Sequence, residues 1–250
     1  MSGLEAVAIF AAGIVAGTIN TVVGSGTLFT FPVLLGFGYA PVVANVSNTV
    51  GLVPGSASGA FGYRRELAGQ RRRVIGLAGA SVSGAIVGAI LLLSLPASAF
   101  KAIVPVFIAV ALVLIVLQPR ISRAVAVRRP HARGRVGPLA TAAVFCGGIY
   151  GGYFGAAQGI MVLAILSLAV DEELQRLNAV KVVLTGVVNL VSGVIFIIAA
   201  HVAWAPAGLI AGGSVLGGVV GARIGRRLPA QALRAVIVVV GIAAIVHLLS

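Results

Sequence analysis

Residues 17–35 read GTINTVVGSGTLFTFPVLL, and residues 148–166 read GIYGGYFGAAQGIMVLAIL. In each stretch a glycine cluster interrupts an apolar run, which then continues only through residues 27–40 or 159–170. Both continuations are too short to cross a bilayer, because a spanning helix needs about 20 apolar residues. We therefore predict two hairpins, each broken by glycine inside the membrane and returning to the face from which it entered.

The composition of the whole chain agrees with a membrane location. Of the 250 residues, 60% are apolar and 9% are charged, whereas soluble domains carry roughly 25% charged residues. This excludes a soluble globular protein. Eight spans of about 20 residues would account for most of the apolar positions. We predict an all-α polytopic membrane protein with about eight transmembrane segments.

The chain also carries an internal duplication. Residues 84–103 align with residues 217–236 at a constant offset of 133, which also pairs Asn45 with Asn178 and Asn48 with Lys181. Each half would contain one glycine-broken hairpin and three transmembrane helices. The predicted units are a first repeat at residues 1–117, a basic cytoplasmic linker at 118–137 and a second repeat at 138–250.

The arginines discriminate between two topologies. If each broken segment were an ordinary crossing, 11 arginines would lie on one side of the membrane and 5 on the other. If each broken segment returns to its own face, all 16 lie on one side, as the positive-inside rule favours for cytoplasmic loops. The two repeats are then inverted, and their glycine breaks can meet near the midplane, where transporters hold their substrates.

The breaks themselves are candidate anion sites. The N-terminus of a half-helix presents free N–H groups and a partial positive charge, and glycine lets the backbone approach a ligand. The alternative is that the glycines only allow close helix packing, as the GxxxG spacings at Gly84/Gly88 and Gly217/Gly221 suggest. The candidate ligand-binding residues are Gly24, Ser25, Gly26 and Thr27 in the first break and Gly155, Gln158 and Gly159 in the second.

A polar stripe follows the second break. Asn178, Lys181, Thr185 and Asn189 recur at helical spacing in an otherwise apolar segment, and Asn45 and Asn48 are the first-half counterparts. Such a stripe should face the protein interior. Two interpretations of Lys181 stay open: it binds substrate, as intramembrane ionisable residues commonly do, or its long side chain snorkels to the interface.

The remaining chemistry is sparse. All five acidic residues fall in predicted loops or at the N-terminus, so no embedded carboxylate would bind a cation or relay protons. We find no pattern that predicts a catalytic residue, a metal site or a cofactor, and the short arginine clusters do not resemble a nucleic-acid-binding face. Tyr63, Phe100 and Trp204 near span ends are typical of membrane-interface anchors.

The paired motifs resemble the TauE/SafE family of sulfite exporters and related anion transporters. The resemblance rests on GTINTVVGSGTLFTFPVL with ANVSNTVG, and on GGIYGGYFGAAQGIMV with LNAVKVVLTGVVNLVSG. It adds Asn20, ahead of the first break, to the candidate site, and Ser25 and Ala157 stand where the family pattern leads us to expect glycine. It implies transport of sulfite, a sulfonate or a similar small anion across the plasma membrane.

We therefore expect a transporter of small oxyanions embedded in the lipid bilayer. An anion channel is one alternative, and a membrane enzyme or assembly partner without flux is another. The sequence leaves the exact anion, the direction of transport and the oligomeric state open.

Overall fold

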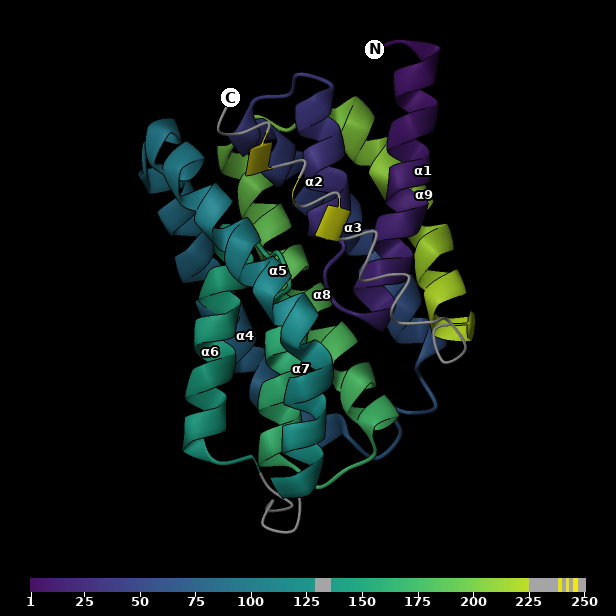
Figure 1. The fold of residues 1–250 in the computed structure, drawn as a ribbon, viewed down its shortest axis with the longest axis vertical. Coiled ribbons are helices and arrows are strands. Elements are labelled where there is room, and N and C mark those ends of the chain that lie inside the picture. Colours follow the sequence, from purple (N-terminus) through teal and green to yellow (C-terminus); the bar gives the residue numbers. More distant parts are fainter. Residues whose placement is uncertain (129–135, 225–237, 240–241, 243–244, 247–250) are drawn as a thin grey trace.

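The computed structural model describes residues 1–128 and 136–224, together with 238–239, 242 and 245–246. Within the two long ranges the chain folds into helices joined by short connections (Figure 1). In chain order the helices are α1 (Gly3–Val22), α2 (Thr27–Gly36), α3 (Pro41–Gly62), α4 (Arg71–Ser94), α5 (Ala97–Arg128), α6 (Pro138–Tyr153), α7 (Gln158–Ala169), α8 (Leu174–Ala199) and α9 (Trp204–Ile224).

Five of these helices are long and apolar enough to cross a membrane: α1, α4, α5, α8 and α9. The prediction of about eight segments is thus met in part by the described residues. Helix α3 has 22 residues but carries polar side chains along one face, and α6 has only 16 residues. The last predicted span, residues 231–249, lies largely outside the described residues.

Both predicted breaks are confirmed. Helix α1 ends at Val22 before α2 begins at Thr27, and α6 ends at Tyr153 before α7 begins at Gln158. The Tyr39 hydroxyl, just after α2, donates a 3.0 Å hydrogen bond to Glu5 Oε1 in the first turn of α1. The first hairpin therefore returns to the end of the molecule at which it began.

The second hairpin begins and ends at the arginine-rich end of the molecule. Val136, just before α6, packs against the cluster that contains Val170, just after α7. Glu172, in the same connection, forms ion pairs with Arg73 at 3.4 Å and with Arg176 at 3.0 Å.

These ion pairs bear on the two topologies. Arg73 lies in the first turn of α4 and Arg176 in the first turn of α8, so the starts of these two helices lie at the same end of the molecule. A topology with ordinary crossings would place Arg176 on the face opposite Arg73, and the shared contact with Glu172 does not fit it. The arginines at positions 129, 133, 135, 226, 227 and 234 lie outside the described residues.

The main helix contacts join helices of the first half of the chain to helices of the second half. Helix α1 packs on α9 as α6 packs on α4, and α3 packs on α9 as α8 packs on α4 (Figure 1). A Cβ atom added at Gly84 would lie 2.2 Å from the carbonyl oxygen of Phe145, and one at Gly217 would lie 2.1 Å from that of Ile14. These close approaches give the two glycines the packing role of the alternative interpretation.

Helix α5 extends further than the predicted first repeat. It continues past residue 117 to Arg128, into the predicted linker, because Arg and Ala are good helix formers. Two predicted interface anchors are also wrong: Tyr63 and Phe100 are each 1% exposed. Phe100 packs edge-on against Phe31 of the first hairpin and Phe154 of the second, so its ring is buried by both hairpins rather than by lipid. Trp204, the third predicted anchor, is exposed.

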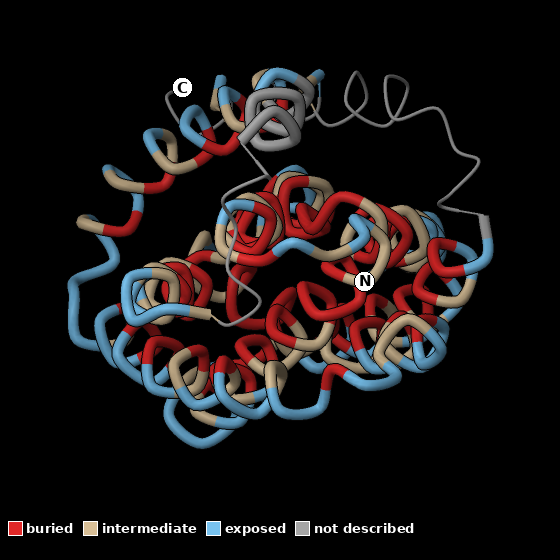
Figure 2. Tube along the Cα trace, turned by 90° about the horizontal axis from the view of Figure 1, so that it is seen from below, coloured by how far each residue is buried: buried red, intermediate tan, exposed pale blue. Residues whose placement is uncertain are grey.

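Burial separates an inner from an outer surface. Buried residues face the centre of the bundle and exposed residues its periphery (Figure 2). Large apolar side chains such as Ile90 and Ile198 are exposed on the outside, whereas Asn48 and Lys181 are fully buried. A membrane protein shows this distribution because its outer surface contacts lipid, and the polar stripe lies in the interior as predicted.

Candidate functional site

The tips of the two hairpins touch. The N–H of Gly159 donates a 3.0 Å hydrogen bond to the carbonyl oxygen of Gly24. A Cβ atom at either residue would lie only 2.5 Å from the Cα of the other. The prediction that the glycine breaks meet is therefore confirmed, and the absence of a side chain at both positions is what permits the approach.

Three residues in the breaks adopt the left-handed backbone conformation. Gly24 has φ +89° and Gly155 has φ +75°, whereas Ala157 has φ +60°. For a residue with a Cβ atom this conformation costs roughly 1–2 kcal/mol. Ala157 stands where the family pattern led us to expect glycine, and the backbone keeps the glycine-like conformation. The Tyr150 hydroxyl donates a hydrogen bond to the neighbouring carbonyl of Ala156, which fixes this segment.

The start of α2 has unused hydrogen-bond donors. Ser25 is fully buried, and its Oγ has no hydrogen-bond partner among the described residues. The backbone N–H groups of Ser25 and Gly26 likewise donate to no described residue. A buried hydroxyl and free N–H groups at a helix N-terminus are the groups that bind anions in proteins.

In the second break, by contrast, the backbone donors at the start of α7 already have hydrogen-bond partners. The N–H of Gly159 is already used by Gly24, and the N–H of Gln158 donates to Gly155 at 3.4 Å. The buried side chain of Gln158 lies over Gly151, where an added Cβ atom would be 2.3 Å from the amide carbon. The glycine at 151 therefore provides the space for the glutamine side chain.

Lys181 reaches from α8 to both tips. Its side chain is fully buried, and its Nζ donates to the carbonyl oxygens of Asn20 at 3.2 Å and Thr21 at 3.1 Å. These carbonyls belong to the last turn of α1, where the helix leaves them without partners. The Lys181 Cδ would lie 2.9 Å from a Cβ atom at Gly159. A buried ammonium in this position does not fit the snorkelling interpretation.

Two asparagines connect the halves. Asn45 Nδ2, from α3, donates to the carbonyl of Tyr153 at the end of α6 at 3.0 Å. Asn178 Nδ2, from α8, donates to the carbonyl of Thr21 near the end of α1 at 3.4 Å. Each asparagine thus caps the broken helix of the opposite half. The Oδ1 atoms of both are buried and have no described partner.

The other predicted site residues divide into two groups. Asn48 joins the cluster, since its Nδ2 donates to Thr27 Oγ1 at 3.2 Å and its Oδ1 accepts from the Thr30 hydroxyl. Thr30 was not predicted, although it lies one helical turn after Thr27 on the same face.

The side chains of the second group make no hydrogen bond with the residues of the breaks, although the Asn20 carbonyl accepts from Lys181. Asn20 Nδ2 donates to Ser56 Oγ at 3.3 Å, between α1 and α3. The Thr185 hydroxyl donates to the Lys181 carbonyl of its own helix at 3.0 Å, and Asn189 makes no hydrogen bond with a described residue. The structure therefore gathers the N-terminal part of the stripe at the hairpin tips and leaves its C-terminal part outside this cluster.

Comparison with known proteins extends these findings. Residues 9–248 match the sequence profile of the family described as sulfite exporter TauE/SafE. The chain is 27% identical over 234 residues to "Probable membrane transporter protein YfcA" of Escherichia coli K12, covering 93% of this chain and 85% of that protein. It is 28% identical over 244 residues to "Probable membrane transporter protein ORF9" of Sinorhizobium sp., covering 97% and 91%.

No solved structure matches the chain. The family profile nevertheless spans both hairpins, the polar stripe and its first-half counterparts. The match also covers most of the length of the two relatives. With its candidate spans, the chain is a multi-pass membrane protein. It belongs to the TauE/SafE sulfite exporter family.

Proposed function

We propose that this protein transports small oxyanions, most specifically sulfite or an organosulfonate, and that it binds the anion at the two hairpin tips. The observation that carries this proposal is the buried ammonium of Lys181. It contacts two backbone carbonyls and forms no ion pair with a described acidic residue. A buried charge is costly without a counterion, and an anionic substrate would supply one.

The donors at the start of α2 suit an oxyanion. Ser25 contributes a buried hydroxyl, and the N–H groups of Ser25 and Gly26 stand at the positive end of α2. An anion that leaves water must exchange its hydration for donors of this kind, since an unpaired buried anion is strongly disfavoured. We infer that Thr27, Asn48 and Gln158 shape the site around these groups.

We also infer the arrangement in the membrane. Residues 1–117 and 138–250 would form two inverted repeats, and the basic linker at 118–137 would lie in the cytoplasm with the other arginines. The hydrogen bond from Tyr39 to Glu5 at one end of the molecule and the Arg73–Glu172–Arg176 ion pairs at the other support two hairpins that enter from opposite faces. The positive-inside rule assigns the arginine end to the cytoplasmic side of the plasma membrane.

Outward movement of an anion needs no coupled cation in this proposal. A membrane potential of about 100 mV, inside negative, is worth about 2.3 kcal/mol per elementary charge. That free energy corresponds to a roughly fiftyfold outward gradient for a monoanion. The location of the acidic residues agrees with this, because the described ion pairs of acidic side chains lie at the arginine-rich end and not at the tips.

Flux measurements in liposomes test the proposal. Liposomes that contain the purified protein would be loaded with sulfite, methanesulfonate or a neutral solute. An imposed membrane potential should bias the flux of the charged solutes. Lys181→Met should lower anion flux roughly tenfold to hundredfold, since hydrogen bonds to charged groups contribute about 1.5–3 kcal/mol. Lys101→Met is the matched control, because Lys101 is an exposed lysine of α5.

The same experiment separates the alternatives. Currents far above transporter turnover would indicate an anion channel instead. Folded protein that moves a cation or a neutral solute, but neither sulfite nor a sulfonate, would contradict the proposal. Equal anion flux for Lys181→Met and wild type would show that Lys181 does not bind the anion.

A further inference from the structure

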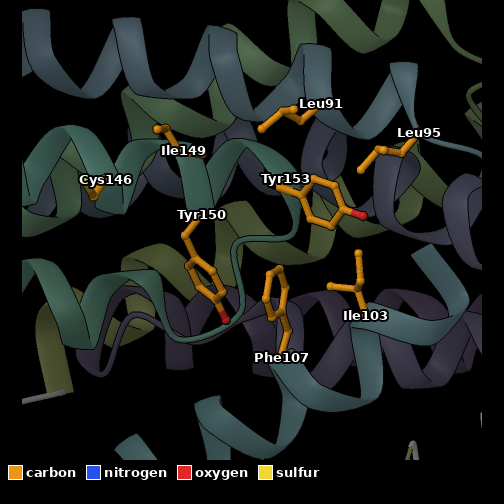
Figure 3. A pocket seen from close by; sticks show the side chains of 8 residues that line it. All are labelled: Leu91, Leu95, Ile103, Phe107, Cys146, Ile149, Tyr150 and Tyr153. Atoms are coloured by element: carbon orange, nitrogen blue, oxygen red, sulfur yellow. The ribbon is translucent and has the colours of Figure 1, made fainter. Parts of the chain in front are cut away.

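A separate pocket opens beside the second hairpin. Its volume is about 350 Å³, within the range of small-molecule sites. Side chains from three helices and the residue after α4 line it (Figure 3): Leu91 of α4, Leu95 directly after it, Ile103 and Phe107 of α5, and Tyr150 and Tyr153 of α6. The lining is apolar except for the two tyrosine hydroxyls.

One of these hydroxyls has no partner. Tyr153 is 6% exposed, and its OH is buried without a hydrogen bond to any described residue. Figure 3 shows this hydroxyl directed toward the space between Leu95 and Ile103. A buried hydroxyl left unpaired is destabilising, so an acceptor oxygen on a molecule in the pocket would restore the missing hydrogen bond.

The mouth of the pocket faces the lipid side of the bundle. Leu91 and Leu95 are 41% and 40% exposed, and the candidate spans α4 and α5 form two of the walls. The pocket extends to the connection between Ser94 and Ala97, where α4 ends and α5 begins. In a bilayer this level approaches the interface, where the ester groups of lipids lie next to the hydrocarbon core.

We propose that this pocket binds one phospholipid of the surrounding bilayer. One acyl chain would fill the apolar space, and an ester carbonyl would accept a hydrogen bond from the Tyr153 hydroxyl. This assignment is independent of the transported anion, since it uses none of the groups at the hairpin tips.

A lipid bound there would stabilise the second hairpin. The Tyr150 hydroxyl donates to the carbonyl of Ala156 in the break, and the Tyr153 carbonyl accepts from Asn45 of the other half. Both tyrosines therefore join the pocket to the backbone that leads into α7. The phospholipid would act as a structural ligand of the hairpin.

Native mass spectrometry of the full-length protein, purified in mild detergent from membranes of known lipid composition, tests this. We expect one phospholipid to remain on the wild-type protein. Leu91→Trp fills the pocket and should lower its retention at least roughly tenfold, as expected when a ligand must displace a bulky side chain. Ile90→Trp is the matched control, because Ile90 is the adjacent residue of α4, is 52% exposed and does not line the pocket.

Tyr153→Phe provides a second variant that keeps the shape of the pocket. Loss of one neutral hydrogen bond should lower phospholipid retention roughly twofold to tenfold. The elution volume of the protein in size-exclusion chromatography should stay unchanged. Equal retention by wild type, Leu91→Trp and Tyr153→Phe would overturn the proposal, as would wild-type protein that retains no phospholipid. Displacement of the lipid by millimolar octanesulfonate would also overturn it, because the pocket would then belong to the substrate path.

Discussion

The Gly159 N–H and the Gly24 carbonyl oxygen, 3.0 Å apart, form a direct backbone hydrogen bond between the two hairpins. The bond uses a donor at the start of α7 that could otherwise face an anion, while the donors at the start of α2 stay free. The two half-helix termini are therefore unequal in this structure. We infer that α2 provides the stronger anion-binding terminus and that α7 positions it.

The Gly24–Gly159 contact leads to a first prediction. In Gly159→Ala the new Cβ atom would lie 2.5 Å from the Gly24 Cα and 2.9 Å from the Lys181 Cδ. Overpacking of this kind typically costs about 1–3 kcal/mol, so we expect a lower melting temperature and a large loss of anion flux. Gly208→Ala is the control, since an added Cβ at Gly208 meets no atom within 4 Å. Wild-type flux in Gly159→Ala would show that the tips need not touch.

A second prediction concerns the unpartnered hydroxyl of Ser25. Ser25→Ala removes a buried Oγ that no described group satisfies, so the melting temperature should stay the same or rise. The apparent affinity for the transported anion should nevertheless fall roughly twofold to tenfold, the effect of one lost hydrogen bond. Concentration dependence of flux and thermal unfolding would be measured on the same preparation.

Ser47→Ala is the reciprocal control for Ser25. The buried Oγ of Ser47 accepts a 2.9 Å hydrogen bond from the N–H of Ala203, which stabilises the start of α9. Its loss should lower the melting temperature and leave the apparent anion affinity unchanged. If Ser25→Ala destabilised the protein without changing affinity, Ser25 would be structural.

The sequence predicted the positions of the breaks and the interior location of the polar stripe. Both predictions rest on local signals: the length of an apolar run and the spacing of polar residues along a helix. The arginine distribution also predicted that each hairpin returns to the face from which it entered. Each of these signals can be recognised without knowing which helices pack together.

The partners of the site residues could not be predicted in the same way. Helical spacing places Asn45 and Asn178 on a face, but it does not reveal that each amide caps a broken helix of the opposite half. Lys181 is similar, because its two interpretations differ only in where the side chain ends. Phe100 was misassigned since its position near a span end resembles an anchor, whereas its ring packs on Phe31 and Phe154.

The third prediction follows from the two asparagine caps. Asn45→Leu would leave the Tyr153 carbonyl without its donor. Asn178→Leu would remove one of two donors to the Thr21 carbonyl, which would keep its hydrogen bond from Lys181. An unsatisfied buried group costs about 1–3 kcal/mol and the loss of one hydrogen bond about 0.5–1.5 kcal/mol, so both variants should melt at lower temperature. The effect should be larger for Asn45, because its 3.0 Å hydrogen bond is shorter than the 3.4 Å bond of Asn178 and because the Thr21 carbonyl keeps a second donor.

Asn189→Leu is the matched control for these variants. Asn189 lies on the same helix as Asn178 and makes no hydrogen bond with a described residue. Its replacement should change the melting temperature much less. Equal destabilisation by all three substitutions would indicate a general cost of losing an amide, and the capping role would be wrong.

The last prediction concerns orientation in the membrane, and it uses single cysteines in a Cys146→Ala background. Arg71 and Asp171 are exposed at the arginine-rich end, and His201 is exposed at the connection between α8 and α9. Because arginine-rich loops are retained in the cytoplasm, cysteines at 71 and 171 should react with an impermeant maleimide only after permeabilisation. A cysteine at 201 should react in intact cells, since α8 separates it from residue 171. The reverse pattern would place the arginine end outside, and labelling of 71 and 171 from different sides would contradict the ion pairs that Glu172 makes with both Arg73 and Arg176.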